Sequence, residues 1–210
     1  MKSNLLDIDC KFTSHYKELL GIQKNIFQQL RDYPFDLTKN EITDAIVERM
    51  DSFWFFNVNN NKEILGRDIN TTAADFFTET CLLFVKAYFE QNVGVKVYSE
   101  KPISTQGNVI RPDISIWRDE QLIAAIELKV SNGWKGNTMI SHLLEREKQI
   151  FDVHPNCIFG VIAFWNFFDR NMEGWSTKYI GVKMFDPAKS HPRTNAKIED
   201  LLLQIENVLH

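Results

Sequence analysis

This chain of 210 residues has few cysteines, no long apolar run and no excess of positive charge. Its three cysteines, Cys10, Cys81 and Cys157, are widely spaced and form no CxxC pair, which excludes a disulfide framework and a zinc ribbon. No apolar run approaches the roughly 20 residues that a membrane span needs. The first residues contain no apolar stretch of the kind found in secretory signals. We therefore expect a cytoplasmic protein with no membrane partner.

The charge balance limits the class of partner. The net charge is −4 and the pI is near 5.8, whereas a general nucleic-acid coat protein is normally basic. An enzyme that acts on nucleic acid is not excluded, because acidic metal ligands and a local basic groove can coexist in one molecule. The composition, 44% hydrophobic and 25% charged, is that of an ordinary globular protein.

The length suits one domain with an extension, which we place at residues 1–66, and a core at 67–210. Apolar residues recur at helical spacing up to a break at Tyr33-Pro34. Thr38, followed by Glu41, predicts a capping box for a second helix that ends near Phe55. A polar loop is expected at 57–62. We expect these helices to pack on the core or on a partner subunit, with DNA contact as the alternative.

A third helix is predicted from Thr72 to Phe89. Glu79 has apolar neighbours three and four residues away, so we expect it at or near the buried stripe. An unpaired carboxylate in such a place is costly unless it binds a partner or a metal ion. Glu79 is therefore a candidate functional residue, and a carboxylate at the edge of the stripe that reaches water is the alternative. Glu90 stands four residues after Lys86 and predicts an ordinary ion pair.

The stretch Val109–Val130 contains two β-rich runs separated by a short polar turn. Asp113 directly follows a proline in the first run, and Glu127 and Lys129 are two residues apart in the second. Strand side chains alternate with period two, so Glu127 and Lys129 must point to the same side. Antiparallel pairing of the runs can bring Asp113 close to them. A simple Glu127–Lys129 salt bridge is the alternative, but a second acid nearby exceeds what such a pair needs.

The second run is apolar on both faces before the charged pair, which is typical of a central strand covered on both sides. The remaining predicted elements follow the same patterns of periodicity. They are a strand at 93–99, a helix at 138–151, a central strand at 157–165, an edge strand at 174–185 and a closing helix at 194–209.

Three basic residues around the helix at 138–151 could contact a phosphate backbone: Lys135, Arg146 and Lys148. A solvated helix face is the alternative for each of them. His142 and His154 match no zinc spacing and are expected to be structural or exposed.

The order helix, three strands, helix, strand resembles the PD-(D/E)XK nuclease superfamily, whose common core is that of restriction endonucleases. The resemblance covers roughly Thr72 to Trp165. The motif reads Pro112-Asp113, thirteen intervening residues, then Glu127-Leu128-Lys129. It implies an α/β fold with a restriction endonuclease-like core, in which helices flank a mixed central sheet. It also implies hydrolysis of nucleic-acid phosphodiesters with Mg²⁺, for which Mn²⁺ can substitute.

The chemistry of phosphodiester hydrolysis agrees with this assignment. The substrate is an anion that repels hydroxide, so the reaction needs charge neutralisation and an activated water. Asp113 and Glu127 would be Mg²⁺ ligands, because this ion takes one or two carboxylates and keeps its other positions for water and phosphate. Lys129 would stabilise charge at the reacting phosphate. Glu79 would bind a metal ion, directly or through water, or orient Lys129.

Two sequence features argue against particular classes of nuclease. The exonuclease branch of the superfamily often has a Gln followed four residues later by Tyr, whereas Gln149 is followed at that distance by Val153. No GxxxxGK[ST] motif is present, which argues against a motor-coupled nuclease. We expect a stand-alone endonuclease acting on DNA, in restriction or another anti-phage role, and working as a homodimer. The alternatives are a catalytically inactive nucleic-acid-binding module and a metal-dependent hydrolase of small phosphate esters.

Overall fold

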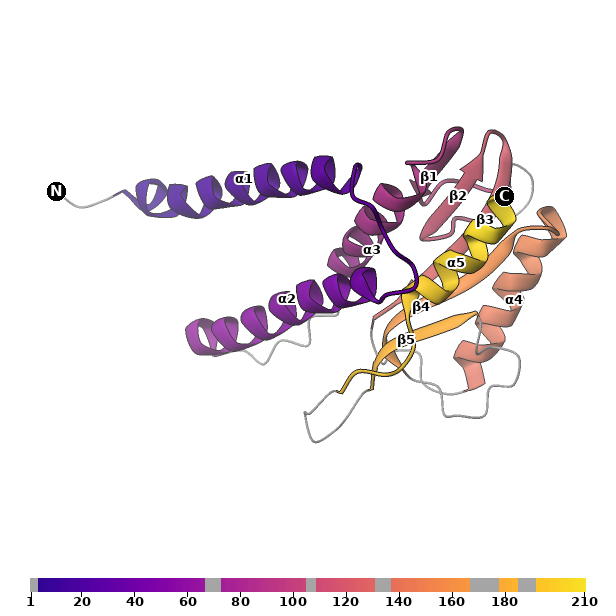
Figure 1. The fold of residues 1–210 in the computed structure, drawn as a ribbon. Coiled ribbons are helices and arrows are strands. Elements are labelled where there is room, and N and C mark those ends of the chain that lie inside the picture. Colours follow the sequence, from indigo (N-terminus) through magenta and orange to yellow (C-terminus); the bar gives the residue numbers. More distant parts are fainter. Residues whose placement is uncertain (1–3, 67–72, 105–108, 131–136, 167–177, 185–191) are drawn as a thin grey trace. The chain divides into compact units, whose positions relative to one another are not determined.

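The computed structural model describes residues 4–66, 73–104, 109–130, 137–166, 178–184 and 192–210 (Figure 1). Helices flank a five-stranded sheet in this part of the chain. The elements in chain order are α1 (Leu5–Leu30), α2 (Glu41–Leu65), α3 (Ala74–Phe89), β1 (Val95–Ser99), β2 (Ile114–Arg118), β3 (Gln121–Lys129), α4 (Asn137–Val153), β4 (Ile158–Asn166), β5 (Tyr179–Met184) and α5 (Ile198–Leu209).

The chain divides into two compact units, Met1–Pro34 and Phe35–His210. The first unit consists of α1 and the turn after it, and Asn4 caps this helix by accepting a hydrogen bond from the Leu6 amide. We expected a boundary at residue 66, but α2 belongs to the second unit. Its amino end is bound by a side chain of α5, Glu199, which joins α2 to the core.

Two local predictions about α2 are wrong. The polar segment 57–62 is not a loop but part of the helix, because the side-chain amides of Asn57 and Asn60 donate to backbone carbonyls one turn earlier. The expected capping box is also absent: the hydroxyl of Thr38 donates to Asp36, and the N-cap residue is Asn40. The matching start signal of α3, Thr72, lies outside the described residues.

The strands pair in the order β1-β2-β3-β4-β5. The pairs β1–β2 and β2–β3 are antiparallel and the pairs β3–β4 and β4–β5 are parallel, so the sheet is mixed. The predicted mixed α/β class and the order helix, three strands, helix, strand are confirmed. The expected edge strand corresponds to β5, and residues 174–177 and 185 of that prediction lie outside the described part.

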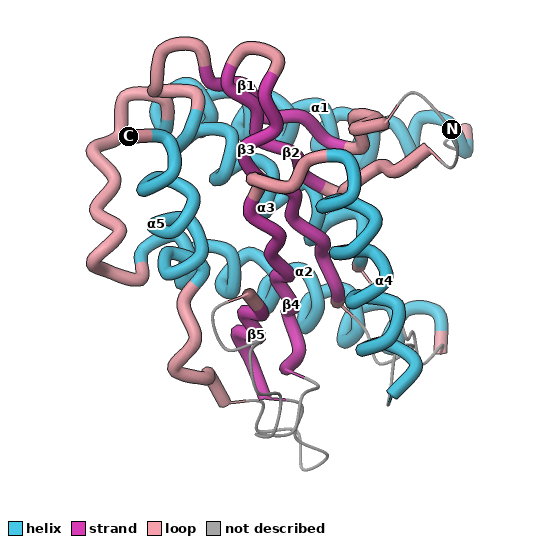
Figure 2. Tube along the Cα trace, turned by 90° about the vertical axis from the view of Figure 1, so that its right-hand side faces the viewer, coloured by secondary structure: helices cyan, strands magenta, loops and turns pink. Residues whose placement is uncertain are grey.

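Helices cover both faces of the sheet, as the two perpendicular views show (Figures 1 and 2). On one face, Leu143 and Ile150 of α4 share a buried cluster with Ala125 and Val161. On the other face, α5 approaches so closely that a Cβ on Gly160 would lie 2.6 Å from a Leu201 methyl carbon. Seven consecutive residues of β3, 122–128, are buried, which confirms the prediction of a central strand.

The carboxyl end of β3 is where the candidate site lies. Because β2 runs antiparallel to β3 and Ile114 pairs with Ile126, the start of β2 adjoins the end of β3. Asp113 immediately precedes β2, and Glu127 and Lys129 are the last charged residues of β3. The hairpin therefore places all three side chains at one edge of the sheet, the edge where open α/β sheets tend to have their sites.

Candidate active site

Asp113, Glu127 and Lys129 converge, as expected. The Lys129 ammonium lies 3.2 Å from Glu127 Oε2 and 3.8 Å from Asp113 Oδ2. Asp113 Oδ2 also accepts a hydrogen bond of 2.6 Å from the backbone amide of Leu128, which lies between the other two residues in sequence. This backbone contact fixes the Asp113 carboxylate beside β3, so the position of the acid does not depend on the lysine alone.

Arg146 of α4 closes the other side of the cluster. Its Nε donates to Glu127 Oε1 at 3.0 Å, and its Nη2 donates to the Arg111 carbonyl at 2.8 Å. One guanidinium thus joins the helix, the end of β3 and the segment before β2. The contact with Glu127 was not predicted, because the sequence suggested only that Arg146 could meet a phosphate.

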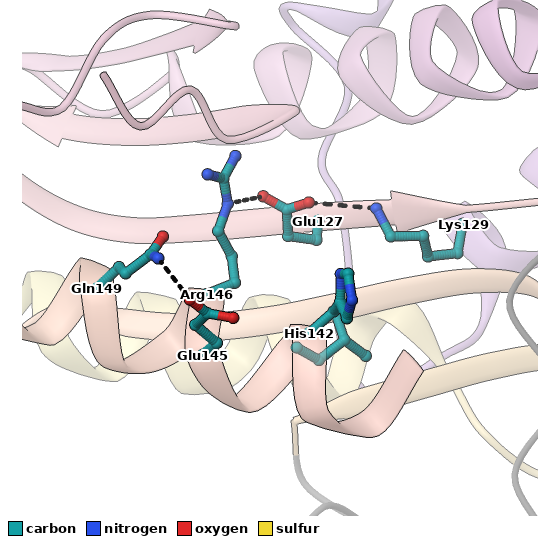
Figure 3. Close-up of a pocket in the computed structure, with 7 residues that line it drawn as sticks. Glu127, Lys129, His142, Glu145, Arg146 and Gln149 are labelled. Carbon is teal, nitrogen blue, oxygen red and sulfur yellow. Dashed lines mark hydrogen bonds and ion pairs between the residues drawn. The ribbon is translucent and has the colours of Figure 1, made fainter. Parts of the chain in front are cut away.

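A pocket of about 320 Å³ opens beside this cluster (Figure 3). Glu127 and Lys129 line it from β3, and the opposite wall comes from one face of α4. The residues contributed by α4 are His142, Leu143, Glu145, Arg146 and Gln149.

His142 and Gln149 are site residues that the sequence reasoning missed. His142 is exposed, as one of the predicted alternatives had it, but it also faces the pocket. A signal was present in the spacing, because 142, 146 and 149 follow one another at four and three residues and so share one helix face. Lys148 is exposed and is not among the pocket-lining residues, and Lys135 lies outside the described part.

Burial and like charge make the ionised form of Asp113 costly. Desolvation is the main cause that raises the pKa of this carboxyl, and the nearby Glu127 carboxylate raises it further. The Leu128 amide, Lys129 and Arg146 act in the opposite direction without cancelling the effect. Burial also raises the pKa of the Cys81 thiol, with Asp113 as the second cause, which places this buried residue of α3 near the acid.

Glu79 does not join the site. Its side chain is exposed, so the expected buried position is wrong and the alternative, a carboxylate that reaches water, holds. The buried positions next to it on α3 are Thr80 and Cys81, and Cys81 is the one near Asp113. Within the described residues, no three His, Cys, Asp or Glu side chains are grouped as metal ligands. Of the three carboxylates expected to bind metal, Glu79, Asp113 and Glu127, only Asp113 and Glu127 remain candidate ligands.

Lys86 and Glu90 form the predicted ion pair, and both side chains also bind the backbone of β1. The Lys86 ammonium lies 2.6 Å from Glu90 Oε1, which confirms the pair, and the same oxygen accepts the backbone amide of Val97. Lys86 also donates to the Val97 carbonyl. The pair therefore joins the end of α3 to β1 and has no place in the site.

Comparisons with known proteins identify no relative: no family model, no curated protein and no solved structure matches this chain. None of the helices in the described ranges is both long enough and apolar enough to span a bilayer.

Proposed function

We propose that this chain is a metal-dependent endonuclease of the PD-(D/E)XK type that hydrolyses phosphodiester bonds in DNA, in restriction or another anti-phage defence role. The observation that carries the proposal is the convergence of Asp113, Glu127 and Lys129, the last two of which line a pocket. A salt bridge alone needs one acid and one base. Here a second acid is fixed beside the first by a backbone hydrogen bond, although its ionisation is unfavourable there.

The donor set fits a magnesium ion. Mg²⁺ is normally bound through one or two carboxylates, with water and phosphate oxygens at its other positions. Asp113 and Glu127 provide two such groups, and Asp113 Oδ1 accepts no hydrogen bond from a described residue. Burial, and then the neighbouring Glu127 carboxylate, raise the pKa of Asp113, and a bound cation would relieve the repulsion between the two acids. Bound there, the ion would neutralise phosphate charge and lower the pKa of the attacking water.

The residues of the chain itself would position and stabilise the substrate. Lys129 is held between both carboxylates, so its ammonium is already directed to the place where phosphate charge would build up. Its ammonium lies between two acids at the wall of the pocket, and we therefore assign it electrostatic stabilisation of the reacting phosphate rather than proton abstraction. His142 and Gln149 extend the polar lining of the pocket and could contact further phosphate oxygens or the leaving group.

One observation favours a second candidate, a catalytically inactive nucleic-acid-binding module. Two cations, Lys129 and Arg146, face two carboxylates, Asp113 and Glu127, so the formal charges of the cluster sum to zero. Such a network could stabilise the edge of the sheet without a metal ion. The two candidates differ in whether divalent cations bind here and whether DNA is cut.

The test is incubation of the purified chain with plasmid DNA, single-stranded DNA and RNA, in Mg²⁺, in Mn²⁺ and in chelator. We expect cleavage only with a divalent cation, and a loss of about a thousandfold for Lys129→Ala, because the removed ammonium would stabilise the transition state by several kcal/mol. Lys96→Ala, at an exposed position of β1, is the matched control. Cleavage that persists in chelator, or that Lys129→Ala leaves unchanged, would contradict the proposal.

A further inference from the structure

The ion pair between Arg146 and Glu127 has a consequence for metal binding. Glu127 is the more buried of the two acids, with 9% of its side chain exposed, and both of its oxygens are engaged. Oε1 accepts from Arg146 at 3.0 Å and Oε2 from Lys129 at 3.2 Å. A divalent cation that coordinates this carboxylate therefore meets a cation that is already in place.

The two cations differ in how easily they can leave. Lys129 extends from β3 itself, is 15% exposed and is shared with Asp113, so it stays near both acids whichever oxygen it contacts. Arg146 comes from another element, is 29% exposed and lines the pocket. Its only other hydrogen bond among the described residues is to one backbone carbonyl, that of Arg111. Arg146 is thus the cation that a metal ion would displace from Oε1.

A displaced Arg146 would have a suitable alternative partner. The guanidinium is planar and carries several donors in a fork that matches two phosphate oxygens, and its charge is permanent. From α4 it already reaches the wall of the pocket in which the scissile phosphate would lie (Figure 3). Phosphate would satisfy the donors that Glu127 releases, so the guanidinium need not remain unpaired in a partly buried place.

We propose that Arg146 exchanges partners during function: it neutralises Glu127 while the metal ion is absent, and it binds a phosphate oxygen of the nucleic acid once the ion occupies Glu127. This inference rests on the proposed nuclease function. It makes the metal ion and the nucleic acid mutually dependent ligands, because each favours the state in which Arg146 has left Glu127. By thermodynamic linkage, each raises the affinity of the other by the same factor.

The first measurement is Mn²⁺ binding to the protein alone, followed by electron paramagnetic resonance, for the wild type, Arg146→Ala and Lys148→Ala. Both substitutions remove one positive charge from α4, but only Arg146 contacts Glu127. Arg146→Ala is expected to bind Mn²⁺ about tenfold more tightly than Lys148→Ala, the scale of one charge-assisted hydrogen bond. Arg146→Lys keeps a cation near Glu127 and should resemble the wild type.

The second measurement is the affinity for a short phosphorothioate DNA, in chelator and in Mn²⁺. In chelator Arg146 stays with Glu127, so Arg146→Ala should change DNA affinity by less than threefold. In Mn²⁺ the same substitution should weaken DNA binding tenfold or more, because the phosphate contact is lost. An arginine that simply contacts DNA would weaken binding equally in both conditions, and that result would overturn the exchange.

The outcomes separate this inference from the nuclease proposal. If the wild type binds no Mn²⁺, with or without DNA, the proposed function fails and the exchange fails with it. If the wild type binds Mn²⁺ but Arg146→Ala binds it no more tightly than Lys148→Ala, only the exchange is overturned. A folding defect in Arg146→Ala would appear in its circular dichroism spectrum. The comparison then moves to Arg146→Met, which keeps the apolar stem and should show the same tenfold gain.

Discussion

Asp113→Asn is expected to abolish metal-dependent cleavage and, in the same protein, to raise the thermal stability of the metal-free state. The loss should be about a thousandfold or more, since a ligand that helps neutralise phosphate charge contributes several kcal/mol to the transition state. The gain should be of the order of 1 kcal/mol, because the substitution removes a charge that is unfavourable where it lies. An asparagine oxygen can still accept the hydrogen bond from the Leu128 amide.

The stability gain should depend on pH in a defined direction. Burial, and then Glu127, raise the pKa of Asp113 above its value of 3.8 in the unfolded chain. Well below pH 3.8 the carboxyl is protonated in both states, and its charge costs nothing. As the pH rises from there through the raised pKa, the unfolded state ionises first, so the wild type loses stability and Asp113→Asn does not. The difference in unfolding free energy should thus grow through this interval and stay constant above it.

Divalent metal should reverse the order of stability. A ligand that binds only the folded state stabilises it by mass action, and Asp113→Asn would lack one of the two carboxylates needed. In millimolar Mg²⁺ the wild type should therefore melt at a higher temperature than the variant. Asp119→Asn is the matched control, since it makes the same change at the exposed turn of the same hairpin. A wild-type Tm that Mg²⁺ does not alter would contradict the assignment of Asp113 as a ligand.

The central part of the candidate site could be predicted because short-range rules determine it. Period two places Glu127 and Lys129 on one face, and a two-residue turn after Arg118 brings the start of β2 beside the end of β3. These two rules bring Asp113 near the pair, but its exact position also depends on a bulge between Ile116 and Trp117, which neither rule predicts. The bulge shifts the register by one residue, so that Ile114 pairs with Ile126 and the preceding Asp113 comes beside Glu127. The central strand could be predicted from its apolar residues on both faces, which require helices on both sides of the sheet.

Contacts between distant elements account for what could not be predicted. Glu79 was placed near the buried side from its apolar neighbours on α3, but which face of a helix is buried depends on what packs against it, and here Thr80 and Cys81 face inward. The ion pair of Arg146 with Glu127 depends on how α4 lies over β3, a distance of 19 residues along the chain. Helical periodicity shows which residues share a face of α4 but not which strand residue that face meets.

The amino end of α2 shows this limit most clearly, because its cap comes from 157 residues away. Glu199 is buried, and its carboxylate accepts hydrogen bonds from the backbone amides of Ile42 and Thr43 and from the Thr43 hydroxyl. The Thr43 hydroxyl in turn accepts from the amide of Ile198, the first residue of α5. The two helices thus cap each other, and neither N-cap residue, Asn40 or Lys197, makes a side-chain cap of its own.

Glu199→Ala is therefore expected to lower the free energy of unfolding by about 3 kcal/mol, since it leaves two buried amides without acceptors and removes a carboxylate from a helix amino end. Asp200→Ala removes the neighbouring, exposed carboxylate and should cost under about 0.5 kcal/mol. In Glu199→Ala, amide hydrogen exchange should rise more in α2 than in β3 and β4, because the lost contacts join that helix to α5. Equal acceleration in α2 and the central strands, or a loss no greater than that of Asp200→Ala, would show that the mutual cap does not hold α2 in place.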